Sequence, residues 1–562
     1  MKILIIGGYG VFGGRLCELL AVDRRLSLWI AGRSLAQAEV FCKSLVARAG
    51  TNDKINVLVF DRNKDLATQI NAAQPDLVID ATGPFQSYGE DPYRLIKACI
   101  ACKVNYMDFA DGSDFVKGVS QFDAAARDQQ IFVLSGVSSF PVLTAAVVRR
   151  LSKDLKLVTS ITGGVAPSPY AGVGKNVIRA ISAYAGQSVK LVRGGISTSA
   201  SALVENLRYT VAPPGRMPLR NIRFSLVDVP DLQVLPELWP ELDNVWMGAG
   251  TVPEVLHKML NALSWLVKLK ILPSLSPFAS LFFYVINVLR WGEHRGGMFV
   301  DIQGTKTDGT AVSRSWHLLA EGNDGPYIPC MALEAVIKRV LTGNSPAYGA
   351  RHASNDVELD DYEHLFSHRT IFTGQRDAKE DSESPYLFKT LLGSAWNNLP
   401  LTLQKLHSAA SEQAWSGVAS VTRGQGLLAR AVAWLFRFPD ESDDVRVMVK
   451  VKPTPSGEIW ERTFGSQTFL SVLSTGKGLS NRLLNERFGP FSFGIALVYD
   501  NSKLKYVVRN WQFLGIPLPN ALAPQGDSYE FEKDGYFCFN VEIKQRLIGL
   551  IVRYKGSLSL SK

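Results

Sequence analysis

The stretch Gly8-Tyr9-Gly10-Val11-Phe12-Gly13 follows the pattern GxGxxG and decides the fold of the amino-terminal part of the chain. It comes directly after the apolar residues 2–6, which are typical of a buried strand, and it opens a stretch with helical spacing. Glycines allow a tight turn here and let the backbone approach a pyrophosphate, whose charge suits the free N–H groups of a helix start. The loop therefore predicts a dinucleotide site, with a purely structural copy of the loop as the alternative.

Strand and helix patterns alternate over residues 1–135. The strand-like runs are residues 2–6, 26–31, 55–60, 77–80, 106–109 and 131–134, and helical stretches such as 13–21 and 34–48 lie between them. This alternation predicts an α/β fold, namely a Rossmann-type doubly wound parallel sheet with helices on both faces.

The end of the second strand indicates which dinucleotide binds. An NAD site usually has Asp or Glu at this position, whereas here Arg33 and Ser34 offer a cation and a hydroxyl that suit a 2′-phosphate. We therefore expect NADP rather than NAD. The alternative is that Arg33 is only a solvated residue at a helix start.

Two later strand ends extend the predicted cofactor site. Asp61 follows the third strand and is expected either to bind the adenine amino group or to cap the next helix. Residues 81–85 follow the fourth strand, where the chain passes the nicotinamide ribose. The full predicted set is Gly7, Gly8, Tyr9, Gly10, Val11, Phe12, Gly13, Arg33, Ser34, Asp61, Ala81, Thr82, Gly83, Pro84 and Phe85.

Several motifs together resemble the saccharopine dehydrogenase-like NADP-binding oxidoreductase family. They are residues 7–13, Ala31-Gly32-Arg33-Ser34, Gly83-Pro84-Phe85-Gln86-Ser87-Tyr88-Gly89, Asn105-Tyr106-Met107-Asp108 and the later Ser135-Gly136-Val137-Ser138-Ser139-Phe140-Pro141. The resemblance covers the chain to about residue 375. It implies hydride transfer between NADP and a C=N, C=O or activated C=C bond of a small-molecule substrate.

The chain after residue 135 is expected to carry the substrate. Strand-like residues 157–164, 222–226, 297–303 and 312–320 indicate an inserted α+β substrate or dimerisation domain over residues 136–325. Residues 326–343 are predicted to form a helix that returns to the first sheet. Residues 344–389 are expected to connect the domains, with a polar linker at 374–384.

The candidate catalytic residues are Tyr88, His294 and Arg295. A tyrosine or histidine can move the proton that accompanies a hydride, and an arginine can hold a carboxylate. The alternative for His294 and Arg295 is that they only end a helix. Cys99 and Cys102 form a single CxxC without further ligands, so we expect helix packing there and no metal site.

Residues 255–289 contain two apolar helical stretches joined by a segment rich in proline and serine. Such a hairpin is expected to contact a membrane surface, or to form a lid or a homodimer interface; a true membrane span is the third alternative. The hairpin also supports a different class of function, a non-catalytic dinucleotide-binding protein associated with lipid or membrane.

The overall composition excludes several classes of protein. With 46% hydrophobic and 20% charged residues, the chain is no disordered protein, and six cysteines in 562 residues make no disulfide scaffold. The net charge of +9 is spread over a long chain without runs of basic and aromatic residues, so we expect no nucleic-acid partner. The amino terminus has no pattern of a secretory signal, which predicts a cytoplasmic protein, and residues 255–289 add association with a membrane as an expectation.

Residues 390–562 are predicted to form a β-rich domain. Alternating runs at 445–452, 458–465, 468–473, 491–499, 503–511, 528–532, 536–543 and 549–556 indicate an antiparallel sheet, curved or closed like a half-barrel. Motifs around Trp460, Glu486, Gly515 and Arg553 resemble a domain of unknown function that follows saccharopine dehydrogenase-like halves in bacterial proteins. The interior is expected either to hold a lipid-like ligand or to be filled by side chains.

Overall fold

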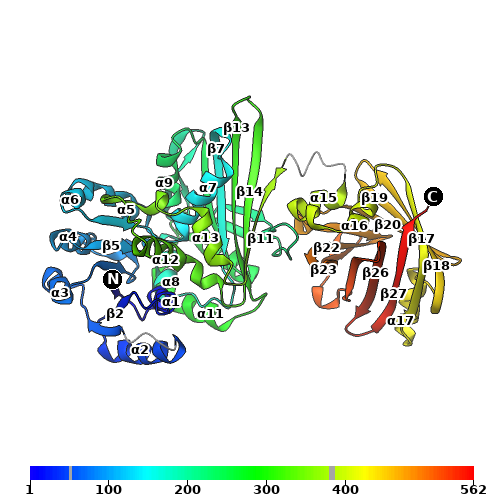
Figure 1. Cartoon of the computed structure of the whole chain (residues 1–562), viewed down its shortest axis with the longest axis horizontal. Coiled ribbons are helices and arrows are strands. Elements are labelled where there is room, and N and C mark those ends of the chain that lie inside the picture. Colours follow the sequence, from blue (N-terminus) through cyan, green and yellow to red (C-terminus); the bar gives the residue numbers. More distant parts are fainter. Residues whose placement is uncertain (50–53, 379–385, 562) are drawn as a thin grey trace. The chain divides into compact units, whose positions relative to one another are not determined.

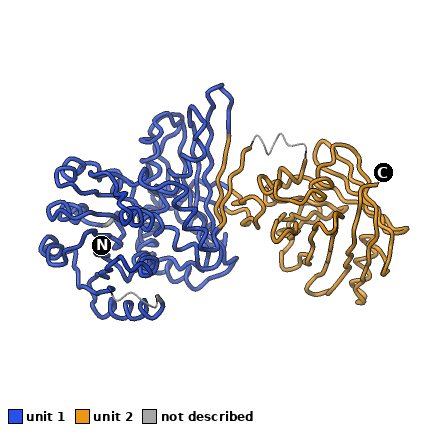
Figure 2. Tube along the Cα trace, viewed as in Figure 1, with its two compact units in different colours: residues 1–208, 223–312, 320–371 blue, residues 209–222, 313–319, 372–562 orange. Residues whose placement is uncertain are grey.

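The computed structural model describes residues 1–49, 54–378 and 386–561. It divides into two compact units, which Figure 2 shows in different colours. The first unit comprises residues 1–208, 223–312 and 320–371, and the second comprises residues 209–222, 313–319 and 372–562.

The first unit contains a sheet of seven parallel strands in the order β15-β6-β5-β4-β1-β2-β3 (Figure 1). Its elements, in chain order, are β1 (Lys2–Ile6), α1 (Val11–Leu20), β2 (Ser27–Gly32), α2 (Leu35–Ala49), β3 (Ile55–Val59), α3 (Leu66–Ala73), β4 (Leu77–Asp80), α4 (Arg94–Ala101), β5 (Asn105–Asp108), α5 (Ser113–Gly118), α6 (Asp123–Asp128), β6 (Phe132–Ser135) and α7 (Thr144–Leu151). The strand order reverses at β1, which lies between β2 and β4. Doubly wound sheets bind dinucleotides at this reversal, beyond the carboxyl ends of the strands. The predicted Rossmann-type sheet is confirmed.

The returning helix is also confirmed, as α12 (Ile328–Leu341). The thiol of Cys330 at its start donates to the carbonyl of Phe12 in α1 at 3.4 Å, so α12 packs beside the glycine loop. The chain then adds β15 (Gly349–His352), which pairs with β6 as a seventh strand of the first sheet.

The expectation that residues 344–389 only connect domains was therefore wrong in part. Besides β15, the segment contains α13 (Leu359–Phe366) and β16 (Ile371–Asp377), and residues 374–377 of the expected linker belong to β16. This polar strand is stable because Arg376 is buried and donates to the carbonyls of Ala212 and Leu391, each at 2.9 Å. Residues 379–384 of the expected linker lie outside the described residues.

A second, mixed sheet has the strand order β10-β11-β12-β7-β13-β14-β16. The elements between α7 and α12 are β7 (Leu155–Ala166), α8 (Lys175–Tyr184), β8 (Ser188–Arg193), β9 (Ile196–Ser201), β10 (Asn206–Tyr209), β11 (Ile222–Leu226), α9 (Asp231–Leu238), β12 (Asn244–Gly250), α10 (Glu254–Lys268), α11 (Ala279–Val288), β13 (Arg295–Lys306) and β14 (Ala311–Glu321). All four strands predicted for this part are present, and β8 with β9 forms a separate hairpin.

The apolar stretch 255–289 forms α10 and α11 with a turn between them. Within residues 1–49, 54–378 and 386–561, no helix combines the length and the apolar character needed to cross a bilayer.

The second unit contains a closed antiparallel barrel. Its strands β17 to β23 and β25 to β27 each pair with the next in the chain, and β27 pairs with β17 to close the ring. The elements are α15 (Leu387–Leu392), α16 (Leu401–Leu406), β17 (Gln413–Arg423), α17 (Leu427–Leu435), β18 (Ser442–Thr454), β19 (Gly457–Phe464), β20 (Gln467–Thr475), β21 (Leu484–Phe488), β22 (Phe491–Asp500), β23 (Lys503–Phe513), β24 (Ile516–Pro517), β25 (Ser528–Lys533), β26 (Tyr536–Gln545) and β27 (Gly549–Leu560). The sheet predicted to be curved or half-closed is thus fully closed.

The core of this unit joins apolar side chains of the barrel strands to those of α15 and α16. It also contains ionisable groups. His407 lies 2.6 Å from Glu530 and stacks on Phe388, and Arg462 pairs with Glu486 at 3.2 Å. We expected the barrel interior either to hold a lipid-like ligand or to be filled by side chains. In the structure, side chains occupy much of it.

Candidate active site

The glycine loop joins β1 to α1 at the carboxyl edge of the first sheet. Gly7 has a φ of +80°, and its N–H donates to the carbonyl of Ala31 at 2.8 Å. A Cβ on Gly13 would overlap the carbonyl oxygen of Gly7, so only glycine lets the helix approach the loop this closely. The first N–H groups of α1 have no acceptor within the helix and point to this edge. These features fit the pyrophosphate of a dinucleotide.

Ala81 brings the end of β4 against the same loop. A Cβ on Gly7 would lie 2.9 Å from the carbonyl oxygen of Ala81, and the N–H of Ala81 donates to the carbonyl of Ile6 at 2.8 Å. The structure thus brings together the glycine loop and the residues 81–85 that the sequence assigned to one site.

Tyr9 connects the glycine loop to the end of β2. Its hydroxyl accepts a hydrogen bond from the N–H of Ser34 at 3.1 Å, and its ring covers Gly32. The Ser34 hydroxyl in turn accepts from the N–H of Gln37 at 3.3 Å and caps α2. Arg33 is exposed beside this cap, so its guanidinium is accessible to a 2′-phosphate.

Asp61 turns the chain after β3. Its carboxylate accepts from the N–H of Asn63 at 3.0 Å, whereas the cap of α3 is Asp65, which accepts from the N–H groups of Ala67 and Thr68. The alternative that Asp61 caps the next helix is therefore wrong, because the helix begins one turn later. Its role toward the adenine stays a prediction.

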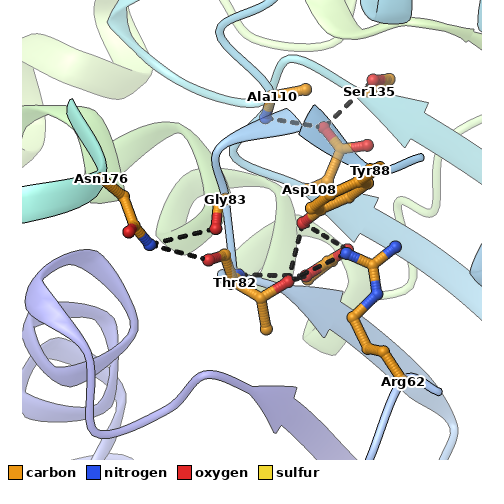
Figure 3. A network of polar contacts seen from close by, with 9 residues as sticks. Arg62, Thr82, Gly83, Tyr88, Asp108, Ala110, Ser135 and Asn176 are labelled. Carbon is orange, nitrogen blue, oxygen red and sulfur yellow. Dashed lines mark hydrogen bonds and ion pairs between the residues drawn. The ribbon is translucent and has the colours of Figure 1, made fainter. Parts of the chain in front are cut away.

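A buried polar network occupies the end of β4 (Figure 3). Asp80, the last residue of β4, is fully buried and accepts from the N–H and hydroxyl of Thr82 at 3.0 and 2.6 Å. A guanidinium nitrogen of Arg62 lies 3.4 Å from the other oxygen of Asp80 and neutralises its charge.

The hydrogen bonds of this network fix the direction of its protons. Because the Thr82 hydroxyl donates to Asp80, its oxygen accepts from Arg62 at 3.1 Å and from the Tyr88 hydroxyl at 2.7 Å. The Tyr88 hydroxyl also lies 3.2 Å from the second oxygen of Asp80. Tyr88 is therefore a hydrogen-bond donor in this state.

Tyr88 keeps its proton in neutral solution. Burial raises the pKa of its hydroxyl far above the ordinary value, and the charge of Asp80 raises it further; Arg62 and the hydrogen bond with Thr82 act in the opposite direction. The guanidinium of Arg62 lies 3.5 Å from the centroid of the Tyr88 ring. Tyr88 can thus offer a proton, and a cation is in place to stabilise the phenolate that remains.

Asn176 connects helix α8 of the inserted domain to this edge of the sheet. It lies in the first turn of α8, and its side-chain amide donates to the carbonyls of Thr82 and Gly83 at 3.2 and 3.0 Å (Figure 3). The residues that follow β4 are therefore held from both the dinucleotide domain and the inserted domain.

Aromatic rings fill the space behind the network. Phe85 is buried, with its ring centroid 4.8 Å from that of Tyr88 and 5.1 Å from that of Phe115. Pro84 precedes Phe85 in the loop. These rings hold Tyr88 against Arg62 and keep water from one side of the network.

Asp108 anchors the end of the neighbouring strand β5. One of its oxygens accepts from the N–H groups of Ala110 and Gly136 and from the hydroxyl of Ser135, at 2.8 to 3.0 Å. The other is buried without a hydrogen-bond partner among the described residues. Burial raises the pKa of this carboxyl to about 7, so a proton on that oxygen suits its surroundings.

His294 and Arg295 lie at the start of β13 and not in the network of Figure 3. The His294 ring is 4.8 Å from that of Tyr170, and Arg295 pairs with Glu293 and lies 3.7 Å from Glu321. They do not end a helix, as the alternative supposed, because the helix before them ends at Val288. Their catalytic role stays a prediction.

Four residues of the site were missed in the sequence, namely Arg62, Asp80, Asn176 and Asp108. Arg62, Asp80 and Asp108 each end or follow a parallel strand, and a search for polar residues at strand ends would have found them. No local pattern marks Asn176, because its role depends on how α8 packs.

Comparison with known proteins supports a dinucleotide-binding domain at the amino terminus. Residues 3–134 match the family model described as the saccharopine dehydrogenase NADP binding domain, and residues 399–558 match a domain of unknown function, DUF4166. A relative from Caenorhabditis elegans named "Lipid droplet localized protein" is 24% identical over 204 residues, which are 34% of this chain and 47% of that protein. The chain thus aligns with about half of the relative's length.

Solved structures of low identity are also similar. Apo saccharopine dehydrogenase (L-Glu forming) from Saccharomyces cerevisiae is 13% identical, with a TM-score of 0.49, over 67% of this chain and 99% of that one. A meso-dapdh mutant from Clostridium tetani is also 13% identical, with a TM-score of 0.31, over 65% and 98%. The amino-terminal domain thus matches the saccharopine dehydrogenase NADP binding domain, and the carboxyl-terminal domain matches DUF4166.

Proposed function

We propose that the protein is an NADP-dependent oxidoreductase that transfers hydride to or from a C=N, C=O or activated C=C bond of a small molecule. One observation supports this most strongly. The glycine loop and the proton-donating network around Thr82 and Tyr88 meet at one edge of the sheet, with Arg33 exposed at the end of the adjacent strand.

The proposal gives each part of this edge a task. When bound, NADP(H) supplies the hydride. The N–H groups at the start of α1 would hold the pyrophosphate, Arg33 and Ser34 the 2′-phosphate, and the residues around Thr82 the nicotinamide ribose. Since Arg33 carries the choice of NADP over NAD, that choice is the most direct part of the proposal to test.

Tyr88 is proposed as the proton donor. Its hydroxyl gives its proton to the substrate atom that becomes negative when the neighbouring carbon gains hydride. The phenolate left behind is stabilised by Arg62 at its ring, and by the Thr82 hydroxyl once this hydroxyl turns its proton from Asp80 to the phenolate. Asp80 holds Thr82 and Arg62 in position for this step.

A second candidate function is a non-catalytic dinucleotide-binding protein at a lipid surface. It is favoured by the large apolar side chains that residues 255–291 expose, and the name of the nematode relative points to a lipid location for that protein. Under either function we expect the protein in the cytoplasm, with a part of it at membranes or lipid bodies. Turnover separates the two: NADPH oxidation with imines, ketones or enoyl thioesters supports the enzyme, and binding without turnover of any of them supports the alternative.

The cofactor assignment predicts a selective effect of Arg33→Ala. Losing one charged contact to a phosphate costs about 1.5–3 kcal/mol, so the Kd for NADPH should rise at least about tenfold while that for NADH stays unchanged. Fluorescence titration measures both constants. Arg48→Ala is the matched control and should change neither, because Arg48 is also exposed but lies in the last turn of α2, the helix that follows Arg33. Equal effects of Arg33→Ala on the two dinucleotides would refute the choice of NADP.

A further inference from the structure

The helix α10 buries polar side chains beside the apolar Val267, and it exposes several other apolar side chains. His257, Asn261 and Ser264 are at most 7% exposed, whereas Met259 and Trp265 are 57% and 45% exposed. A surface helix of a soluble domain has the opposite arrangement, with its apolar stripe toward the core. The orientation of α10 therefore needs an explanation outside the domain's own core.

Hydrogen bonds fix this orientation. His257 lies 2.6 Å from the hydroxyl of Ser225 through one ring nitrogen and accepts from the N–H of Thr251 at 3.2 Å through the other. Asn261 donates to the carbonyl of Leu203 at 2.8 Å. Turning the apolar face inward would leave these buried groups unpaired, at about 1–3 kcal/mol each. The exposed apolar face is thus a stable feature of the fold.

The rest of the hairpin continues the apolar surface. In α11 no residue is charged, and Leu281 and Tyr284 are 56% and 66% exposed. Leu269 and Ile271, where the chain turns from α10, are 60% and 64% exposed, and Trp291 after α11 is 66% exposed. We call the exposed side chains of residues 255–291 the hairpin surface. Exposed apolar patches of this kind on a folded domain mark a place of interaction.

The charges of the hairpin surface have one sign. Residues 255–292 contain no Asp or Glu, while Lys258, Lys268, Lys270 and Arg290 are all exposed. The ammonium group of Lys268 lies 4.5 Å from the centroid of the Trp265 ring. Apolar and aromatic side chains beside lysines form the pattern of a protein surface that enters the headgroup layer of anionic lipids.

We propose that the hairpin surface docks onto an anionic phospholipid surface, with Trp265, Leu269 and Ile271 entering the boundary between headgroups and acyl chains. Charge complementarity favours lipid over a second copy of the chain. Lys258 pairs with Glu254 at 3.3 Å, but a twofold symmetric dimer through this surface would bring Lys268, Lys270 and Arg290 of each copy against the same cations of the other. Headgroups with negative charge neutralise these cations instead.

The docked surface is connected to the candidate active site. Helix α11 packs along α8, as Figure 1 shows, and Asn287 of α11 donates to the carbonyl of Val173 at 3.5 Å. Asn176, three residues later, holds Thr82 and Gly83. Docking would thus place the site's edge near lipid and favour an apolar substrate. This last step rests on the proposed oxidoreductase function, whereas docking itself does not.

Vesicle flotation of the full chain tests the docking. We expect the protein to float with vesicles of phosphatidylcholine containing about 30 mol% phosphatidylserine, and to bind pure phosphatidylcholine at least about tenfold more weakly. The triple variant Trp265→Ser, Leu269→Ser, Ile271→Ser should lose binding to both. The double variant Lys268→Glu, Lys270→Glu should lose only the preference for anionic vesicles. NADPH binding serves as the check that each variant folds, and it is independent of lipid.

A matched control replaces the same number of exposed apolar residues elsewhere in the first unit. Val22, Val40 and Val46 are 68%, 70% and 42% exposed, and their change to Ser should leave flotation unchanged. Docking is refuted if wild type does not float with anionic vesicles, or if the triple Ser variant floats as well as wild type. Dimerisation that the triple variant abolishes, seen by sedimentation without vesicles, would assign the surface to a second copy instead. Loss of flotation with intact turnover would leave the proposed function standing.

Discussion

Tyr88 is the residue whose chemistry the proposal needs most. Changing it to Phe removes the hydroxyl that donates to Thr82 and Asp80 but keeps the ring under Arg62. Turnover should therefore fall about 10²- to 10⁴-fold, the usual contribution of a general acid, while the Kd for NADPH changes less than about threefold. Single-turnover NADPH oxidation and a binding titration measure the two effects.

The control for this change is Tyr93→Phe. The Tyr93 hydroxyl donates to the carbonyl of Phe115 at 3.0 Å, outside the network of Asp80, and its ring also stacks on Phe115. We expect turnover close to that of wild type. Wild-type turnover in Tyr88→Phe would show that the proton comes from another group, and His294 would then be the next candidate to change.

Asp108 makes the stability of the first unit depend on pH. The folded pKa of about 7 lies above the ordinary value of 3.8, so the folded state keeps a proton that the unfolded state loses. Its contribution is present at low pH and is lost as pH rises from about 4 through 7. Asn at this position keeps an oxygen that accepts the same three hydrogen bonds and does not ionise.

We therefore expect Asp108→Asn to remove a part of the decline in the free energy of unfolding between about pH 4 and 7, at about 1.4 kcal/mol per unit of pKa shift. Urea unfolding at a series of pH values measures it. Asp91→Asn, which changes an exposed carboxylate of the same unit, should leave the pH dependence as it is. A variant of Asp108 with the wild-type pH profile would mean that this carboxyl is ionised in the folded protein.

Among single residues, the sequence predicted those whose place in the site depends on the strand or helix next to them in the chain. The glycine loop, Ser34 and Tyr88 lie where their positions next to strands put them. Asn176 could not be assigned in the same way, because it acts through Thr82 and Gly83, which are distant in the sequence. The cap of α3 is Asp65 rather than Asp61 because the helix begins at Leu66, and the sequence did not show this because both aspartates offer the same local signal.

Among the elements, β17 is a strand that the hydrophobic pattern of the sequence did not predict. Its sequence is rich in small residues with weak strand preference, so it was not predicted, yet it closes the barrel between β18 and β27. Position 417 requires glycine, because a Cβ there would overlap the carbonyl oxygen of Ser557 on β27. Tertiary pairing, rather than propensity, makes this strand.

Gly417→Ala should therefore weaken the pairing of β17 with β27, which closes the barrel. Forcing a methyl group into that contact costs about 1–3 kcal/mol and lowers the stability of the second unit alone. Gly426→Ala is the matched control, because a Cβ there meets nothing within 4 Å and the backbone has a φ of −67°. Thermal unfolding measures both variants. Equal midpoints for the two would mean that β17 and β27 separate at no cost.

For the hairpin α10–α11, the sequence predicted the helices but not which face of α10 is buried. Apolar spacing predicted both helical stretches, but only the structure shows that α10 exposes a part of its apolar side chains, such as Met259 and Trp265, and buries polar ones. The buried side chains His257, Asn261 and Ser264 look like a polar surface in the sequence. Their partners Leu203 and Ser225 lie on distant segments and decide which face is buried.

For the whole molecule, the sequence predicted the order of its parts but not how they interleave. The first unit carries the glycine loop and the network of Asp80, and the second carries the barrel. Two short segments belong to the second unit although their neighbours in the chain belong to the first: residues 209–222 connect β10 to β11, and residues 313–319 lie within β14. No composition change marks such segments, because they are defined by what they pack against.

This division predicts how the full chain unfolds with its cofactor. A ligand that binds only the folded state stabilises it by RT ln(1 + [L]/Kd), about 2.7 kcal/mol at a hundredfold excess over Kd. Because the glycine loop and the Asp80 network both lie in the first unit, NADPH should raise the midpoint of one calorimetric transition and leave the other in place. Gly417→Ala identifies the second transition, since it lowers the barrel's midpoint without touching the site. An equal shift of both transitions by NADPH would show that the two units unfold as one, and a shift of the barrel's transition alone would move the dinucleotide site out of the first unit.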